Sequence, residues 1–272
     1  MLSYRHAFHA GNHADMLKHF VLYLTLDYFN RKDKPYWYID THSGAGLYDL
    51  RGNEAQKVGE YKQGIALLQQ AAKLPPGLHD FLGRLNAILP EPHLYCGSPW
   101  LAQAMLRPAD KLRLFELHPA DFQHLQHNMQ QARLGRRGQV VQTDGYQGLI
   151  ALLPTPTRRA LVLIDPPYEE KQDYQRVENT LREALKRFAQ GSYLVWYPCL
   201  SREESQRLPE SLFPRVFPPI LPCRRDRAQS IFWRLVATFA KHPSAKPPRC
   251  RSRPPDATLR LDKKPPAHGH WR

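Results

Sequence analysis

Short apolar runs alternate with amphipathic stretches along most of the chain. The runs have the length of buried strands, and helical periodicity over residues 119–132 and 173–189 separates some of them. Strands that are separated by helical stretches are typical of a parallel sheet with helices on both faces. The predicted strands are residues 36–40, 112–117, 139–143, 161–164 and 192–196.

The first amphipathic stretch, residues 13–29, predicts a helix that begins after Asn12. Asparagine is a favoured residue immediately before a helix, because its side-chain oxygen accepts a hydrogen bond from the first turn. Apolar residues recur at helical spacing along this stretch. The face that we expect to be buried consists of Met16, Leu17, Phe20, Val21 and Leu24.

Two further helical patterns occur within residues 55–89, where the segment 74–77 (LPPG) separates them. Proline and glycine at such a position indicate a break between helices. Loop signals follow, and another helix is expected to begin at Trp100. We interpret residues 52–98 as a helical subdomain that is inserted into an α/β domain spanning residues 1–240.

A turn that contains two glycines, residues 41–46 (THSGAG), follows the first predicted strand at Asp40. Glycine lets a backbone turn sharply and approach a ligand closely at the carboxyl end of a strand. The turn matches neither the dinucleotide-binding pattern nor a P-loop. Glu116 closes the next strand, where a carboxylate can accept hydrogen bonds from both hydroxyls of a ribose. A plain turn and an exposed strand-end carboxylate are the ordinary alternatives.

The strand at residues 161–164 runs directly into Asp165-Pro166-Pro167-Tyr168. The amine of a nucleobase is a poor nucleophile because its lone pair is delocalised into the ring. Acceptors on its N–H groups free that lone pair, and Asp165 offers a carboxylate while Pro166 offers a carbonyl. The prolines fix φ and remove competing donors, so these acceptors are held rigidly. Tyr168 is expected to supply a flat face on which an extruded base stacks.

These motifs resemble those of the class I S-adenosylmethionine-dependent methyltransferases that act on amino groups of bases. The sequence is most similar to the 23S rRNA adenine-N6 methyltransferases of the RlmJ type, over roughly residues 1–200. The matching segments are MLSYRH, FHAGNHAD and LKH within residues 1–19, DTH at 40–42, GSP at 97–99, ELHP at 116–119, DG at 144–145, IDPPY at 164–168 and WYP at 196–198.

The resemblance implies a Rossmann-like methyltransferase fold, S-adenosylmethionine as cofactor and 23S rRNA as partner. It also implies that Asp165 is catalytic and that Tyr4 lies near the substrate. The residues independently favour Glu116 at the ribose and Asp144, after the third strand, at the adenine amino group of the cofactor. The implied cofactor contacts are His19, His42, Ser98, Glu116, Asp144, Gly145 and Asp165.

Composition fits an ordinary globular protein, since 42% of the 272 residues are hydrophobic and 11% are aromatic. No apolar run approaches the roughly 18 residues that a membrane helix requires. The four cysteines lie far apart and show no metal-ligand spacing, which fits a reducing cytoplasm. His6, His9 and His13 have the spacing of a helical metal site, but Gly11 makes a continuous helix there improbable, so we predict no metal. We expect a monomer.

The net charge of +14 is concentrated near the C-terminus. Residues 223–272 contain 13 Lys and Arg against 3 Asp and Glu, whereas the preceding residues contain 26 against 22. Within this region only Ser230–Phe239 resembles a strand, and the sequence offers it no partner. Residues 241–272 are expected to be a disordered basic tail.

Two other functions fit parts of this pattern. The chain could be an adenine-N6 methyltransferase acting on DNA, because the proposed pocket reads a base and not a sugar. It could also be a non-enzymatic nucleic-acid-binding protein linked to the use of external DNA. The intact Asp165–Tyr168 motif and Glu116 argue against this second alternative, because a site without activity has no physical need for them.

Overall fold

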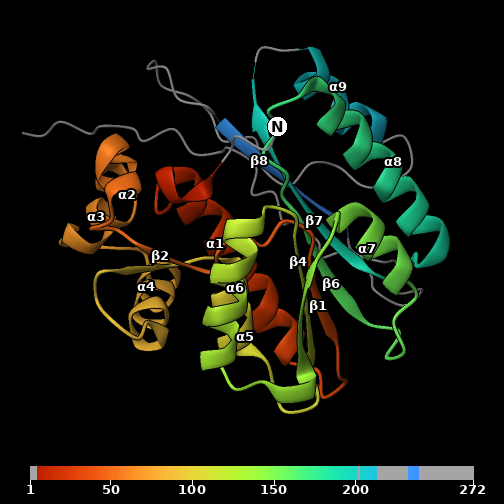
Figure 1. Ribbon diagram of the computed structural model, residues 1–272, viewed down its shortest axis with the longest axis horizontal. Helices are drawn as coiled ribbons and strands as arrows, with labels where there is room; N and C mark the ends of the chain where they lie inside the picture. The colour runs from red at the N-terminus through yellow and green to blue at the C-terminus, as the bar shows by residue number, and fades with distance from the viewer. Residues whose placement is uncertain (1–4, 201–202, 213–231, 239–272) are drawn as a thin grey trace, which may run out of the picture. The chain divides into compact units, whose positions relative to one another are not determined.

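The computed structural model describes residues 5–200, 203–212 and 232–238, and all of them belong to one unit of the chain, Met1–Ala240. A six-stranded sheet forms its centre, in the order β5-β4-β1-β6-β7-β8 (Figure 1). The first five strands in this order are parallel, and β8 is antiparallel to β7. The predicted parallel sheet is therefore confirmed.

The five predicted strands all form, each within a few residues of its expected position. Their bounds are Trp37–Asp40 for β1, Lys111–Glu116 for β4, Gly138–Gln142 for β5, Ala160–Ile164 for β6 and Ser192–Cys199 for β7. The prediction that nothing pairs with Ser230–Phe239 is wrong. Residues Phe232–Thr238 form β8, which pairs with β7 along its whole length. The expected tail, residues 241–272, lies outside the described residues.

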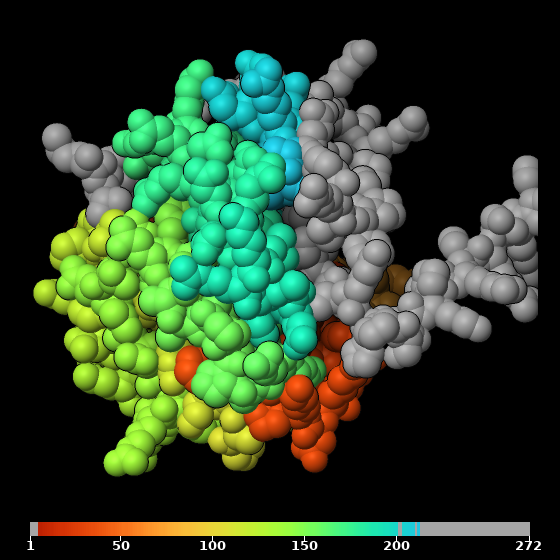
Figure 2. Space-filling model, turned by 90° about the vertical axis from the view of Figure 1, so that its right-hand side faces the viewer, coloured from red at the N-terminus to blue at the C-terminus, as the bar shows by residue number. Residues whose placement is uncertain are grey.

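Helices cover both faces of the sheet. On one face lie α1 (His13–Asn30), α5 (Ser98–Met105) and α6 (Pro119–Gln131), and on the other lie α7 (Gly145–Leu152), α8 (Lys171–Arg187) and α9 (Glu203–Leu212) (Figure 1). In Figure 2, α8 and α9 pack together on the surface that faces the viewer. Among the described residues, no helix is both long enough and apolar enough to cross a bilayer.

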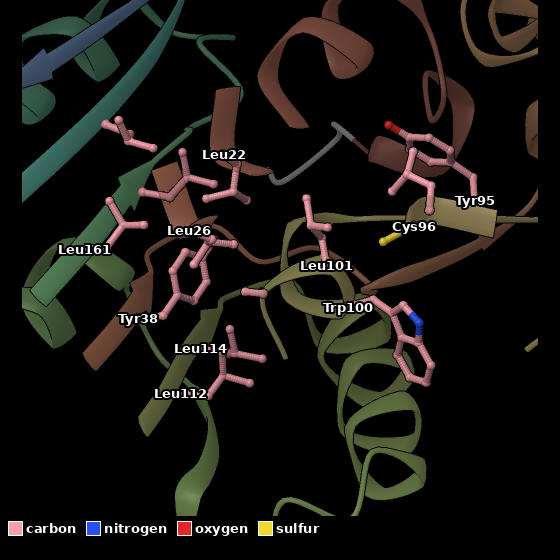
Figure 3. Close-up of a cluster of buried hydrophobic side chains, with 14 of the residues drawn as sticks. Leu22, Leu26, Tyr38, Tyr95, Cys96, Trp100, Leu101, Leu112, Leu114 and Leu161 are labelled. Atoms are coloured by element: carbon pink, nitrogen blue, oxygen red, sulfur yellow. The ribbon is translucent and has the colours of Figure 1, made fainter. Parts of the chain in front are cut away.

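The alternating direction of side chains along each strand explains why the sheet has a hydrophobic core on each of its two faces. Successive side chains of a strand point to opposite faces, so Tyr38 of β1 belongs to one core and its neighbour Ile39 belongs to the other. Figure 3 shows part of the first core, where Leu22 and Leu26 of α1 lie near Leu161 of β6. The five residues named in this paragraph are fully buried. Full burial of a large apolar side chain contributes about 1.5–3 kcal/mol to the free energy of unfolding.

The region between β1 and α5 carries the helical segments that the sequence indicated within residues 52–98. They are α2 (Asn53–Val58), the 3-10 helix η2 (Glu60–Gln63), α3 (Ile65–Gln70) and α4 (Pro76–Ile88). A two-stranded antiparallel sheet, which the sequence did not predict, brackets them with β2 (Leu47–Asp49) and β3 (Leu94–Cys96). The two ends of the helical segment therefore lie side by side. After β3 the chain continues into α5, which packs on the same face of the main sheet as α1.

Helix α1 forms as predicted, and the Asn12 side chain accepts a hydrogen bond from the Asp15 N–H at 2.9 Å. The prediction of its buried face is confirmed at Met16, which is buried, but it is wrong at Leu17 and Leu24, which are 45% and 46% exposed. The helix is rotated so that it buries polar as well as apolar side chains. The buried polar residues on it are Asp15, Lys18, His19 and Thr25. Three of these four line the cavity described next.

Candidate active site

A solvent-open cavity of about 1230 Å³ lies at the carboxyl ends of the parallel strands. Strand ends of β1, β4, β5 and β6 meet at this edge, as ligand sites in open α/β sheets do. Helix α1 and the first turns of α5 and α7 complete its wall. The cavity brings together most of the residues proposed from the sequence. These are His19, His42, Ser98, Glu116, Asp144, Gly145, Asp165 and Pro166.

Glu116 fixes the turn that follows β1. Its Oε2 accepts a hydrogen bond from the Gly44 N–H at 2.7 Å, and its Oε1 accepts one from the His118 N–H at 2.8 Å. Burial raises the pKa of this carboxyl above its ordinary value. Gly44 has φ +60, and a Cβ there would lie 2.2 Å from the hydroxyl oxygen of Tyr48. Only glycine therefore suits this turn, which carries the backbone against the cavity.

Asp144 caps helix α7 and faces the same cavity. Its Oδ1 accepts hydrogen bonds from the N–H groups of Tyr146 and Gln147 at 2.9 and 3.3 Å. Its Oδ2 forms an ion pair with Arg176 of α8. A Cβ on Gly145 would lie 1.8 Å from the Thr41 carbonyl oxygen. Glycine thus allows α7 to begin directly against the turn after β1.

Asp165 lies at the end of β6 and is held by a lysine from helix α1. The Lys18 ammonium is 2.6 Å from Asp165 Oδ2 and 3.0 Å from Asp15 Oδ1. The Lys18 and Asp15 side chains are 6% and 4% exposed, whereas the Asp165 side chain is 15% exposed. One buried cation therefore bridges two carboxylates that lie far apart in the sequence. This bridge joins α1 to the segment that carries Pro166.

Asp15 remains ionised beneath this bridge. Burial alone would raise the pKa of its carboxyl, but the neighbouring His6 and Lys18 charges hold that pKa well below its usual range. The His6 ring nitrogen Nε2 lies 2.9 Å from Asp15 Oδ2, and the Gly11 N–H donates to the same oxygen at 3.0 Å. The segment that precedes α1 is thereby tied to the wall of the cavity.

A second buried carboxyl lies at the end of β1. Asp40 is 0% exposed, and its Oδ2 accepts hydrogen bonds from the Ser98 hydroxyl at 2.7 Å and the Tyr38 hydroxyl at 2.9 Å. Burial raises the pKa of Asp40 to about 6, despite these donors. The family resemblance placed Ser98 at the cofactor, and the structure adds that Ser98 links α5 to the strand that begins the turn.

Two of the histidines that line the cavity, His19 and His42, are neutral near pH 7. Burial lowers the pKa of both His19 and His42 to about 3. The Nδ1 atom of His19 lies 2.6 Å from the Tyr95 hydroxyl, and that of His42 lies 2.7 Å from the Thr41 hydroxyl. Neither ring therefore adds positive charge to the cavity.

Tyr168 is placed differently from the sequence prediction. Its side chain is 4% exposed and packs against Tyr174, with the ring centroids 4.7 Å apart. It belongs to the core beneath α7 and α8, and it does not line the cavity. The positive φ of 55° at Tyr168 turns the chain away after Pro167. The expectation that its ring offers a stacking face in this structure is wrong. The aromatic side chains that line the cavity include Tyr48, Tyr146 and, from β7, Trp196. The other expected substrate residue, Tyr4, lies outside the described residues.

The three N-terminal histidines do not share a helix. His6 is in the 3-10 helix η1 (His6–Phe8), His9 ends it, and His13 begins α1. His6 pairs with Asp15, whereas His9 pairs with Glu60 at 3.1 Å. In the part of the chain that the structure describes, no group of three potential ligands is arranged to hold a metal ion.

The charge of the cavity indicates the kind of ligand it suits. Its wall carries more carboxylates than cations, with Lys18 and Arg176 as the permanently charged basic groups among the described lining residues. Such a site suits a ligand with positive charge and hydroxyl or amine donors better than a phosphorylated cofactor. The lining carboxyl groups are Asp15, Glu116, Asp121, Asp144, Asp165 and Asp173.

Sequence reasoning missed the bridge by which Lys18 joins Asp15 to Asp165. The available signal was a lysine and an aspartate three residues apart on a helix whose other residues are largely apolar. Residues three apart lie on one helix face. A buried lysine requires a partner, so this pair on the inner face could have been assigned to a site. Arg176 carried no such signal, and Trp196 was marked only as part of the WYP segment that resembles the family.

Comparison with known proteins identifies relatives over most of the chain. The model of a family described as RsmJ, "Ribosomal RNA large subunit methyltransferase D, RlmJ", matches residues 33–224. The chain is 46% identical over 210 residues to "Ribosomal RNA large subunit methyltransferase J" of Escherichia coli K12, which covers 76% of this chain and 74% of that protein. The protein of the same name from Haemophilus influenzae is 45% identical over 211 residues, with the same coverage of 76% and 74%.

A solved structure supports the same relationship. The crystal structure of a protein from Legionella pneumophila is 35% identical in sequence and superposes with a TM-score of 0.68. The superposition covers 75% of this chain and 74% of the Legionella chain. The similarity therefore extends over most of the length of both proteins.

Proposed function

Since the chain belongs to the RlmJ family of ribosomal RNA large subunit methyltransferases, we propose that it methylates N6 of an adenine in 23S rRNA with S-adenosylmethionine. The chain is thus a methyltransferase with the class I Rossmann-like fold, and its relatives are named for activity on ribosomal RNA. The observation that carries the N6 assignment is the Asp165 carboxylate, held rigidly at the cavity between Lys18 and two prolines. We place the protein in the cytoplasm with its substrate, as a monomer.

The cavity has the chemistry that S-adenosylmethionine requires. When bound, this cofactor supplies a methyl group that is already activated by its positively charged sulfur. Glu116 would accept from the ribose hydroxyls, and Asp144 would accept from the adenine amine of the cofactor. The excess of carboxylates around them complements the positive charges of the cofactor. We further assign His19, His42, Ser98, Gly145 and Asp165 to the wall that holds it, as the family resemblance implied.

Asp165 and Pro166 act on the substrate. Lys18 engages Asp165 Oδ2, so we assign Asp165 Oδ1 as the acceptor for one N–H of the target adenine. The Pro166 carbonyl accepts from the other N–H. Two fixed acceptors favour tetrahedral geometry at the nitrogen and free its lone pair for attack along the line to the methyl carbon. Most of the catalytic effect is therefore alignment and preorganised polarity.

Substitution of Glu116 with alanine is expected to weaken cofactor binding more than it slows turnover at saturating cofactor. Each hydrogen bond from a ribose hydroxyl to a carboxylate is worth roughly 1.5–3 kcal/mol, so the affinity should fall at least about tenfold. Calorimetric titration with S-adenosylmethionine, alongside a methyl-transfer assay, measures both effects. Because Glu116 also accepts from the Gly44 N–H, Glu116→Gln serves as a control that keeps one acceptor. Unchanged affinity in Glu116→Ala would show that the ribose is bound elsewhere.

Removal of residues 241–272 is expected to leave the chemistry intact and to weaken non-specific RNA binding. Every residue that we assign to the site precedes this segment, which is rich in Pro, Arg and Lys. Basic residues that contact phosphates release counterions, so their contribution declines steeply as salt rises. The test is a chain that ends at Ala240, assayed for methyl transfer and for RNA binding across a salt series. Loss of folding or of cofactor binding would show that the segment belongs to the fold.

A further inference from the structure

Five basic side chains lie at the edge of the sheet opposite the cavity. Lys32 and Lys34 are in the loop before β1, Arg107 is in the loop before β4, and Arg158 and Arg159 are in the loop before β6. These three strands are parallel neighbours, so the loops that precede them meet at their amino-terminal ends. We name these five residues the rear basic cluster.

Two arginines of the cluster fix the loop that carries the lysines. Arg107 donates to the carbonyl oxygens of Lys32 and Lys34 at 2.6 and 2.9 Å. Arg159 donates to the carbonyl oxygens of Phe29, at 2.6 Å, and of Lys34. The Arg159 guanidinium also lies 4.6 Å from the centre of the Phe29 ring. The backbone of this loop is therefore held in place, so that little backbone freedom remains to be lost when its side chains bind a ligand.

The rest of the cluster faces solvent. Lys32, Lys34 and Arg158 are exposed, and within the described part of the chain none of the three forms an ion pair. Asp110, the acidic residue nearest to Arg107, is 0% exposed and already paired with it at 2.9 Å. Burial and the charge of Arg107 lower the pKa of Arg159. Asp33, which is exposed between the two lysines, is the other carboxylate near Arg107. Five basic side chains against these two carboxylates leave an excess of positive charge that an external anion would relieve.

We propose that the rear basic cluster is a second contact for the phosphate backbone of the substrate rRNA, remote from the target nucleotide. This inference rests on the proposed function and adds a second binding surface to it. Guanidinium and ammonium groups on a rigid loop are the groups that position a nucleic-acid backbone without reading its sequence. No part of the cavity is needed for this contact.

The separation between the two sites defines which RNA can use both. Arg159 and Asp165 flank the two ends of β6 and lie six residues apart in the sequence, which corresponds to roughly 20 Å along an extended strand. A short single-stranded oligonucleotide that fills the cavity is too short to extend from there to the rear basic cluster. A folded RNA that lies along the side of the sheet is long enough to contact both sites. The cluster should therefore affect long, structured RNA and leave short substrates unaffected.

The test compares two triple variants of the full-length protein. Lys32→Gln, Lys34→Gln and Arg158→Gln together remove three exposed charges from the cluster. The control removes three exposed charges elsewhere, by Lys171→Gln, Lys186→Gln and Arg207→Gln on α8 and α9, the helices visible in Figure 2. Binding to unmodified 23S rRNA is measured across a salt series, and affinity for S-adenosylmethionine is measured by calorimetry.

We expect the cluster variant to bind 23S rRNA roughly tenfold more weakly in 0.1 M salt, with a slope of log K against log salt that is smaller by about 2. The control variant should keep the slope of the unsubstituted protein within about 0.5, and both variants should bind the cofactor normally. A slope in the cluster variant that equals that of the control would overturn the inference. So would an equal loss of affinity for a four-nucleotide adenine-containing RNA.

These outcomes are independent of the proposed reaction. RNA affinity is measured without methyl transfer, so a protein that binds through the cluster but methylates no RNA would refute the proposed function alone. Conversely, normal methylation of 23S rRNA with an unaltered salt slope in the cluster variant would refute the second contact alone. Single substitutions at Lys32 and at Lys34 should each give a smaller loss of RNA affinity than the triple variant. Such a graded loss would show that the effect follows the charge and does not arise from unfolding.

Discussion

Replacement of Asp165 with asparagine is expected to abolish methyl transfer while cofactor affinity stays within a few-fold of normal. An amide can present an N–H where the substrate amine needs an acceptor, so the target nitrogen would lose its preorganised partner. Loss of one such preorganised group typically lowers a rate by about 100- to 1000-fold. Because the asparagine also loses the ion pair with Lys18, thermal stability has to be recorded alongside activity.

The measurement pairs a single-turnover transfer assay on unmodified 23S rRNA with calorimetric titration of S-adenosylmethionine. Asp27→Asn provides a matched control, because Asp27 is a half-exposed carboxylate in the last turns of α1, remote from the cavity lining. That control should retain normal transfer. Near-normal turnover in Asp165→Asn would show that the carboxylate is not the acceptor on which the N6 assignment depends.

Replacement of Lys18 with methionine is expected to cost both stability and activity. The change leaves Asp15 and Asp165 without the cation that lies between them, and Asp15 is almost fully buried. Removal of one partner of a buried ion pair destabilises a protein by about 3–5 kcal/mol, which corresponds to a fall in Tm of roughly 10 °C for a chain of this size. Transfer should fall at least about 100-fold, because Asp165 loses the contact that orients it.

A double variant separates the two effects. Asp15→Asn together with Lys18→Met removes the buried carboxylate as well as its cation, so much of the lost stability should return. Activity should not return, since Asp165 still lacks its partner. Thermal denaturation and single-turnover assays of both single variants and the double variant give the comparison. Recovery of transfer in the double variant would mean that Lys18 acts only through the stability of the fold.

The sheet was predictable because its central strands are buried on both faces. A continuous apolar run such as residues 161–164 is too short for a helix, and prolines lie on either side of it in the sequence, so a buried strand is the better interpretation. β2 and β3 are three residues each, too short to leave a pattern in the sequence. β8 could not be paired in advance, because its antiparallel pairing with β7 joins segments that are separated by more than 30 residues, and no local pattern specifies such a pairing.

The site was predictable where a motif follows a strand and unpredictable where it depends on packing. Glu116 and Asp165 could be placed because the carboxyl ends of parallel strands meet at one edge. The inner face of α1 was misjudged because hydrophobicity alone favoured Leu17 and Leu24, whereas the fold buries Lys18 beside Asp165. Tyr168 was misplaced for a related reason. Its orientation depends on a positive φ that no local sequence rule predicts for tyrosine.

The measurement that tests the central claim most directly is the identity of the methylated nucleoside. Purified protein is incubated with isotopically labelled S-adenosylmethionine and unmodified 23S rRNA, with DNA of mixed sequence in a parallel reaction. The RNA is digested to nucleosides and the labelled product is identified by mass spectrometry. The account predicts label in N6-methyladenosine from 23S rRNA, and none when Asp165→Asn replaces the unsubstituted protein. Label in another nucleoside, or transfer to DNA in preference to RNA, would contradict it.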